Sequence, residues 1–288
     1  MQGGSLSDWL ASLSVPALGI GILITMFGAL WLGQYVRRAQ LRHNPGRDKE
    51  SESSVAQEGY LLGSVLGLLG LLLAFSFGMA LNRYESRREL VTLEANAIGT
   101  AYLRAQMLDE PHRSRLSALL VDYTDNRIRL ADSGGTSNPY LARNDALLTQ
   151  IWAAVRAARE SALTHGVSTA LLMTFNDVID RDTERKLAWS LRLPVEVLIL
   201  IIVYIGITAA VIGHQVDGPR GRRAAILMFV MIALSITVIA DLNRPLSGHA
   251  RESQKPMEML LASLRSQPPR VFDQFSTPRT QASGVTRQ

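Results

Sequence analysis

The apolar residues of this chain are gathered into four long blocks and are not spread evenly along it. The blocks cover residues 15–35, 60–81, 193–212 and 224–240, and Glu196 is the one charged residue inside them. A helix that crosses the hydrocarbon core of a bilayer needs about 20 apolar residues, a length that each block approaches. The pattern therefore predicts four transmembrane helices.

The polar segment between the second and third blocks has the periodicity of helices. Its apolar residues recur at intervals of three and four, which places them on one side of each helix. They are Leu116, Leu119, Leu120 and Tyr123, then Leu147, Ile151 and Val155, and then Leu171, Leu172, Phe175 and Ile179. We find no convincing alternation of the kind that marks a strand. The predicted fold class is an all-α integral membrane protein with four transmembrane helices and a helical extramembrane domain between helices 2 and 3.

The blocks divide the chain into four parts. These are an N-terminal membrane helical hairpin (1–81), the extramembrane helical domain (82–192), a C-terminal membrane helical hairpin (193–240) and a tail (241–288). Within the tail, Pro256–Leu264 is predicted to form a short amphipathic helix. From about residue 266 onward the composition is typical of disorder.

Composition and motifs give no support for catalysis, a cofactor or a metal site. The chain has no cysteine, its five histidines are scattered, and it has no nucleotide-binding, hydrolase or zinc-ligand motif. An acidic run at residues 176–185 suggests a cation site, but Asp177–Arg181 and Asp182–Lys186 have the spacing of ion pairs on a helix. We interpret that run as a solvated helix face and predict that the chain is not an enzyme.

The positive charge of the chain bears on its orientation. The net charge is +5 with a pI near 9.8, and the basic residues lie beside the apolar blocks, where they set topology and need not bind nucleic acid. The loop after the first block is basic and residues 1–14 have no Lys or Arg, so the positive-inside rule places both termini and the helical domain outside the cytoplasm. Arginines also flank the helical domain, and the opposite orientation stays open.

Small residues recur every three or four positions along the second block. They are Gly63, Gly67, Gly70, Ala74 and Gly78. Such spacing allows helices to pack closely in a membrane. It also suits a helix that lines a narrow axial passage in an oligomer, where small and apolar side chains set the radius. The sequence leaves both interpretations open.

Charged residues follow this block at helical spacing. Arg83, Arg87 and Arg88 alternate with Glu85, Glu89 and Glu94. One interpretation is a helix that leaves the membrane with its arginines at the lipid headgroups. The other is a charged rim around the mouth of a pore, with Arg83, Glu85, Arg87 and Arg88 as candidates.

Two motifs carry a resemblance to a known family. The stretch "GLLLAFSFGMALNRYESRRELVTLEANAIGTAYLRA" and the later "DLNRPLSG" resemble the bacterial bestrophin-like membrane proteins of the DUF4239 family. The resemblance covers roughly residues 59–248. It marks Glu94, Asn96, Asp241, Arg244 and Pro245 as family-motif residues.

The chain is more distantly similar to the bestrophins, pentameric anion channels with four membrane helices per subunit. In them the second helix lines the neck of the pore with apolar residues four apart, ending eight residues before an Arg-aromatic pair. Arg83 and Tyr84 match that pair, which places Phe75, Leu71 and Gly67 at the neck. Gly67 departs from the large aliphatic residue usual there.

The resemblance implies an oligomeric ion channel, a pentamer if the likeness extends that far, in the inner membrane of a bacterium. Its expected partners are the lipid bilayer, further copies of the chain and inorganic ions, with no nucleic acid. The alternative is a non-conducting membrane scaffold whose helical domain binds a protein. We also hypothesise that a carboxylate–guanidinium pair joins Asp241 to the arginines of the membrane-exit segment, Arg87 among them.

Overall fold

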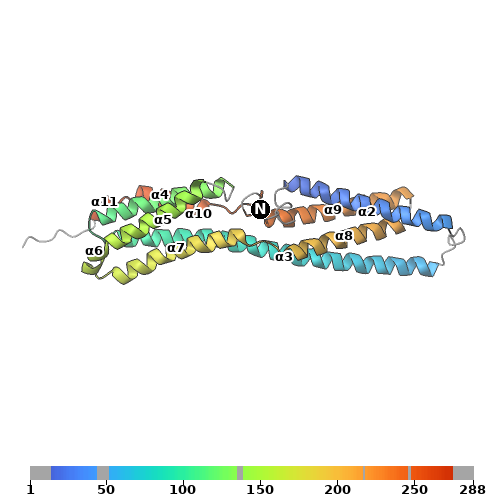
Figure 1. Ribbon diagram of the computed structural model, residues 1–288, viewed down its shortest axis with the longest axis horizontal. Helices are drawn as coiled ribbons and strands as arrows, with labels where there is room; N and C mark the ends of the chain where they lie inside the picture. Colours follow the sequence, from blue (N-terminus) through green and yellow to red (C-terminus); the bar gives the residue numbers. More distant parts are fainter. Residues whose placement is uncertain (1–13, 44–51, 135–138, 217, 246–247, 275–288) are drawn as a thin grey trace, which may run out of the picture. The chain divides into compact units, whose positions relative to one another are not determined.

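The computed structural model describes residues 14–43, 52–134, 139–216, 218–245 and 248–274, and every regular element in these ranges is a helix (Figure 1). The helices are α2 (Val15–His43), α3 (Glu52–Ala105), α4 (His112–Asp132), α5 (Pro139–Ala157), α6 (Arg159–Thr164), α7 (Ser168–Ser190), α8 (Val195–Gln215), α9 (Gly218–Leu242), α10 (Lys255–Ser266) and α11 (Pro269–Asp273). The predicted all-α class is confirmed. α2, α3, α8 and α9 are long and apolar enough to cross a membrane.

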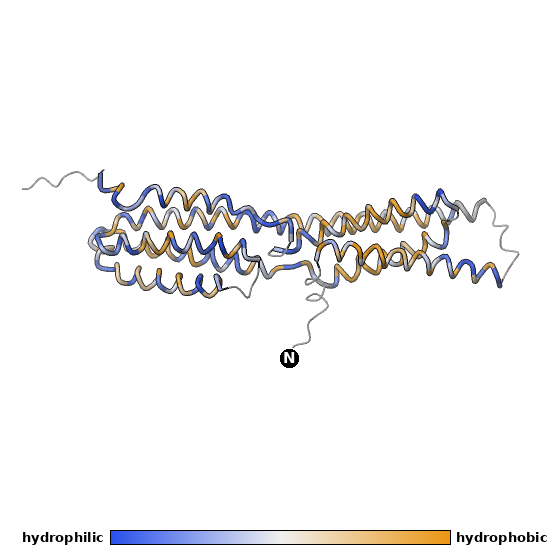
Figure 2. The backbone as a smooth tube through the Cα atoms, turned by 90° about the horizontal axis from the view of Figure 1, so that it is seen from above, coloured by the Kyte–Doolittle hydropathy of each residue, from blue (hydrophilic) through white to orange (hydrophobic). Residues whose placement is uncertain are grey.

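The helices form two compact units. The membrane unit is residues 1–86 with 189–251, and the extramembrane unit is residues 87–188 with 252–288. In the membrane unit apolar residues dominate long stretches of each helix, whereas polar and apolar residues are mixed along the helices of the extramembrane unit (Figure 2). The tail therefore contributes to both units.

α3 is the longest helix and belongs to both units. Its 54 residues correspond to about 80 Å at 1.5 Å per residue, more than twice the thickness of the hydrocarbon core. Gly99 does not interrupt it, because one glycine costs a helix only about 1 kcal/mol and the surrounding residues are good helix formers. The part beyond residue 86 is a helix of the extramembrane unit.

α2 and α8 pack through two glycines in the membrane unit. A Cβ on Gly33 would lie 2.0 Å from the carbonyl oxygen of Ala210, and one on Gly213 would lie 2.1 Å from that of Leu30. Neither position has room for any side chain. α2 also packs on α9, where the rings of Phe27 and Phe229 meet edge to face with centroids 5.7 Å apart.

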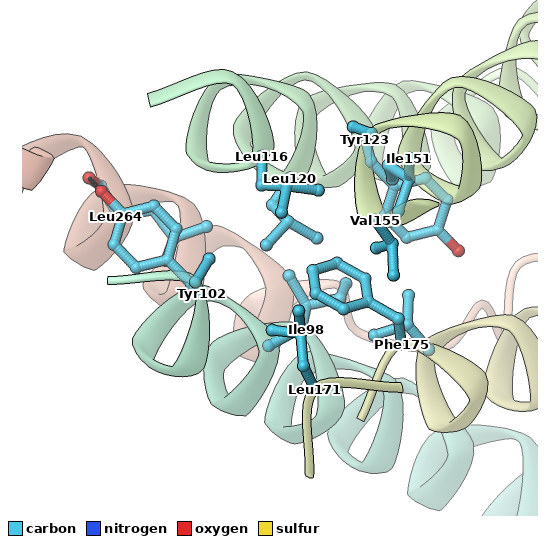
Figure 3. Packing of buried hydrophobic residues seen from close by; sticks show 14 of the residues in the cluster. Ile98, Tyr102, Leu116, Leu120, Tyr123, Ile151, Val155, Leu171, Phe175 and Leu264 are labelled. Atoms are coloured by element: carbon cyan, nitrogen blue, oxygen red, sulfur yellow. Dashed lines mark hydrogen bonds between the residues drawn. The ribbon is translucent and has the colours of Figure 1, made fainter. Parts of the chain in front are cut away.

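The extramembrane unit has its own hydrophobic core, drawn from α3, α4, α5, α7 and α10 (Figure 3). The apolar faces recognised in the sequence supply most of it, including Leu116, Leu120, Ile151, Val155 and Phe175. Residues of α3 and α10 complete it, among them Ile98, Tyr102, Met257 and Leu264. The core is thus closed by a segment that follows the last membrane helix.

The prediction of disorder from about residue 266 is wrong for the residues up to Asp273. The hydroxyl of Tyr102 donates to the carbonyl of Gln267 at 2.7 Å, and Arg113 pairs with Asp273 at 2.5 Å. Phe272 packs against the core. Composition missed these contacts because the partners lie more than 150 residues away in the sequence. Residues 275–288 of the same prediction lie outside the described residues.

Several helix ends differ from the expected bounds. α9 begins at Gly218, six residues before the fourth apolar block, so the basic residues up to Arg223 belong to the helix. The turns that remain use glycine in the left-handed region, with φ of +72° at Gly218 and +66° at Gly166 between α6 and α7. The short helix α6 had no signal of its own in the sequence.

Candidate functional site

The membrane part of α3 has one face toward its own chain and one away from it. Leu69, Ser76 and Ala80 are buried against the other membrane helices. Leu71 and Phe75 are 53% and 64% exposed. Gly67, the third candidate neck position, is exposed as well. The three candidate neck residues therefore share a face that the chain itself leaves open.

The small residues of α3 lie on or near this open face. A Cβ added at Gly63, Gly67, Gly70 or Gly78 would meet nothing within 4 Å. This is the reverse of Gly33 and Gly213, where the neighbouring helix allows no side chain. The close backbone contacts through glycine within the chain are thus those between α2 and α8. No other described part of the chain comes close to these four glycines.

The four candidate rim residues differ in how deeply their side chains are buried. Glu85 and Arg88 are exposed and Arg83 is half-buried. Arg87 is 3% exposed and forms an ion pair with Glu252, Nε to Oε1, at 2.5 Å. Arg87 is therefore held inside the extramembrane unit, away from the exposed side of α3.

Glu94 is at the centre of a buried polar network in the extramembrane unit. The hydroxyl of Tyr123 donates to its Oε1 at 2.7 Å, and Arg127 donates from Nη2 to Oε2 at 3.1 Å. Arg185 of α7 donates to the same Oε2 and from its other terminal nitrogen to Gln254 at 3.3 Å. Glu94 thus joins α3 to α4 and α7 in the middle of an otherwise apolar core.

The charges around Glu94 control its ionisation. Burial raises the pKa of this carboxyl, but the guanidinium groups of Arg127 and Arg185 and the hydrogen bond from Tyr123 outweigh burial and lower the pKa from 4.5 to about 2. Burial and the negative charge of Glu94 raise the pKa of Tyr123 well above its usual value. The network is therefore built around an ionised carboxylate and a neutral phenol.

Asp182 is a second buried carboxylate in this network, which corrects the interpretation of its segment as a solvated face. Its side chain is 3% exposed. Asn144 donates to Oδ1 at 2.9 Å, Nη1 of Arg127 lies 3.0 Å from the same oxygen, and Nζ of Lys186 lies 2.7 Å from Oδ2. The expected pair with Lys186 is present, but it lies at the edge of the core.

The sequence contains a signal for this network, a charged residue on the apolar face of each of two helices. Arg127 lies seven residues after Leu120, on the apolar face of α4. Asp182 lies seven residues after Phe175, on the apolar face of α7. A charged residue at a core position of an amphipathic helix needs a partner of opposite charge. Asn96, in contrast, is exposed and takes no part.

The second family motif shapes the loop after the last membrane helix. The carboxylate of Asp241 accepts hydrogen bonds from the backbone N–H groups of His249 at 2.8 Å and Ala250 at 3.0 Å. A Cβ on Gly248 would lie 2.8 Å from the carbonyl oxygen of Asp241, so only glycine fits there. Arg244 and Pro245 are buried.

The hypothesised pair between Asp241 and the arginines of the membrane-exit segment stays a prediction, and the contacts of Asp241 and Arg87 within their own units are these. Asp241 is engaged by backbone N–H groups of its own loop, and the partner of Arg87 is Glu252. Asn243 in the same loop accepts a hydrogen bond from the backbone N–H of Leu193 at 2.8 Å, which ties the start of the third membrane segment to the end of the fourth.

Within the described residues no group of three or more His, Asp or Glu side chains is placed to hold a metal ion. Four membrane helices with a helical domain between the second and third define the class as a multi-pass membrane protein. The Bestrophin-like domain matches residues 20–257, and the chain belongs to the bestrophin-like family. No curated protein and no solved structure matches the chain.

Proposed function

We propose that this chain is an oligomeric ion channel in which α3 of each subunit lines a shared pore. The observation that carries the proposal is the open, glycine-rich face of α3. Leu71 and Phe75 lie on it among small residues, and no helix in the described part of the chain covers it. The membership of the bestrophin-like family supports the same function.

A face that met only lipid would not need this composition. Glycine costs a helix about 1 kcal/mol relative to alanine, and lipid tails contact large apolar side chains equally well. Small residues are useful where a neighbouring subunit approaches closely or where a passage must stay open. In the proposed channel Leu71 and Phe75 form an apolar constriction, and the small residues around them let the subunits approach the axis.

The constriction can be tested by flux through the purified protein in liposomes. Truncating Leu71 and Phe75 together to Ala should widen it, lower the barrier to wetting and raise ion flux above that of the wild type. Two controls are available. Leu72→Ala removes a half-buried side chain that packs on the membrane core, and Leu227→Ala removes a 67% exposed side chain from α9.

We expect Leu72→Ala to lower stability and Leu227→Ala to change little, with the flux of both near that of the wild type. Equally tight vesicles for the wild type and the double variant, with an intact oligomer, would reject the channel and leave the membrane scaffold. A monomer in detergent and in lipid would also reject it, because one copy cannot enclose the axis. We propose the bacterial inner membrane as its location, by the resemblance to the DUF4239 proteins.

A further inference from the structure

The segment that follows the apolar part of α3 has nearly balanced charge in the sequence. Arg83, Arg87 and Arg88 alternate with Glu85 and Glu89. If all five faced a pore mouth, their charges would nearly cancel and would favour neither cations nor anions clearly. The burial of each side chain determines which of these charges is exposed on the surface of α3.

Two of the three guanidinium groups, those of Arg83 and Arg87, are wholly or partly buried. Arg87 is buried and its charge is neutralised by Glu252 at 2.5 Å. Arg83 is half-buried, and one of its terminal nitrogens is fully shielded from solvent. Glu85 is exposed.

Helical register places Glu85 on the same face as the candidate neck. Seven residues are close to two full turns of a helix, so residues seven apart lie nearly in line. Asn82 lies seven residues after Phe75, and Glu85 lies seven residues after Gly78. Both are exposed, as Phe75 and Gly78 are. Arg88 is also exposed, but it lies about 100° around the helix from the line through Leu71, in line with Gly70 at the edge of this face.

We propose that the ions conducted are cations, selected by a ring of Glu85 carboxylates, one from each subunit, at the mouth beyond the apolar neck. The proposal rests on the proposed function, since it requires α3 to face a shared pore. A ring of carboxylates beside a low-dielectric constriction raises the local concentration of cations and repels anions. Asn82, between the ring and the neck, offers a neutral polar side chain to a partly dehydrated ion.

The sign of selectivity is measured from the reversal potential under a KCl gradient across a planar bilayer that contains the purified protein. The wild type should favour potassium over chloride. Glu85→Gln should lower the potassium-to-chloride permeability ratio on the order of tenfold, and Glu85→Lys should favour chloride. Glu258→Gln, which removes the same charge from an exposed position on α10, is the matched control and should leave the ratio unchanged.

The two proposals fail in different ways. Absence of current for both ions in the wild type would overturn the channel itself and this inference with it. Current that favours chloride in the wild type, or a ratio that Glu85→Gln leaves as it was, would overturn the cation selectivity while the channel stands. Glu85 is exposed, so Glu85→Gln should assemble like the wild type, and the oligomer is checked by size before the current is recorded.

Discussion

At the scale of single residues, the main feature is the ion network around Glu94. Two carboxylates and two guanidinium groups lie together in the core of the extramembrane unit, with Glu94 and Arg127 fully buried. Removing a charge from water is costly, and the network is stable only because each group has a partner of opposite charge. Such a core favours one arrangement of α3, α4 and α7 over slipped ones, which would leave a charge without its partner.

Replacing Glu94 by Gln tests this network. The variant leaves Arg127 and Arg185 with one carboxylate fewer, and breaking a buried ion pair in this way costs about 3–5 kcal/mol. We expect a corresponding loss in the free energy of unfolding at neutral pH, measured by denaturant unfolding of the purified protein in detergent. Glu89→Gln, at an exposed position on the same helix, should change stability by less than about 0.5 kcal/mol.

The difference in the free energy of unfolding between the wild type and Glu94→Gln should also depend on pH, and it should become smaller as the pH falls. The pKa of Glu94 is lowered from 4.5 to about 2 on folding. A lowered pKa means that the ionised group stabilises the fold above pH 4.5 and that this contribution is lost as the pH falls toward 2. A difference that stayed constant down to pH 2 would contradict the assignment.

At the scale of elements, the membrane helices use glycine in two ways. On α2 and α8, Gly33 and Gly213 allow backbone to approach backbone inside one chain. In the membrane part of α3, a Cβ added at Gly63, Gly67, Gly70 or Gly78 would meet no other described residue within 4 Å. Glycine therefore lies in a close helix–helix contact between α2 and α8, whereas on the membrane part of α3 it lies on an open surface.

The contact between α2 and α8 can be tested by adding one methyl group. At Gly33 the new Cβ would overlap the carbonyl of Ala210, so Gly33→Ala should force the helices apart and cost about 1–3 kcal/mol. Gly28→Ala on the same helix meets nothing within 4 Å and should be neutral or slightly stabilising. Thermal unfolding in detergent measures both. Equal melting temperatures for the two variants would mean that the helices are not in close contact.

At the scale of the whole molecule, an even number of membrane helices requires both termini to be on the same side. The basic end of α2 (residues 37–42) and the basic start of α9 (residues 220–223) belong to the opposite side. The positive-inside rule then places the extramembrane unit outside the cytoplasm. Arginines near this unit, such as Arg83 and Arg192, compete with that assignment.

Fusions at the C-terminus test the orientation. If the termini are outside the cytoplasm, as the charge of the first loop predicts, a C-terminal alkaline phosphatase should be active and a C-terminal fluorescent protein should be dark. A fluorescent fusion with inactive phosphatase would place the helical unit in the cytoplasm. Fusion of the same two reporters within residues 44–51, on the other side of the first helix, should give the reverse pattern and serves as the control.

Local pattern was enough to predict most helices of this protein, but not α6 or α11. Long uncharged blocks predicted the membrane helices, since a bilayer accepts little else at that length. Apolar residues at intervals of three and four predicted α4, α5 and α7, and the motifs on α3 and after α9 carried the family. Each of these features depends on residues close together in the sequence.

The tertiary structure decided which polar groups meet and which faces stay open. The pairing of Arg87 with Glu252 and of Glu94 with Arg185 joins residues far apart in the sequence, and local pattern contains no information on such distances. The same holds for the end of the tail, where Gln267 and Asp273 are held by distant helices. The alternating charges after the apolar part of α3 did not show which of them are exposed, because exposure depends on what packs against the helix. In the structure Arg87 is buried, whereas Glu85, Arg88 and Glu89 are exposed.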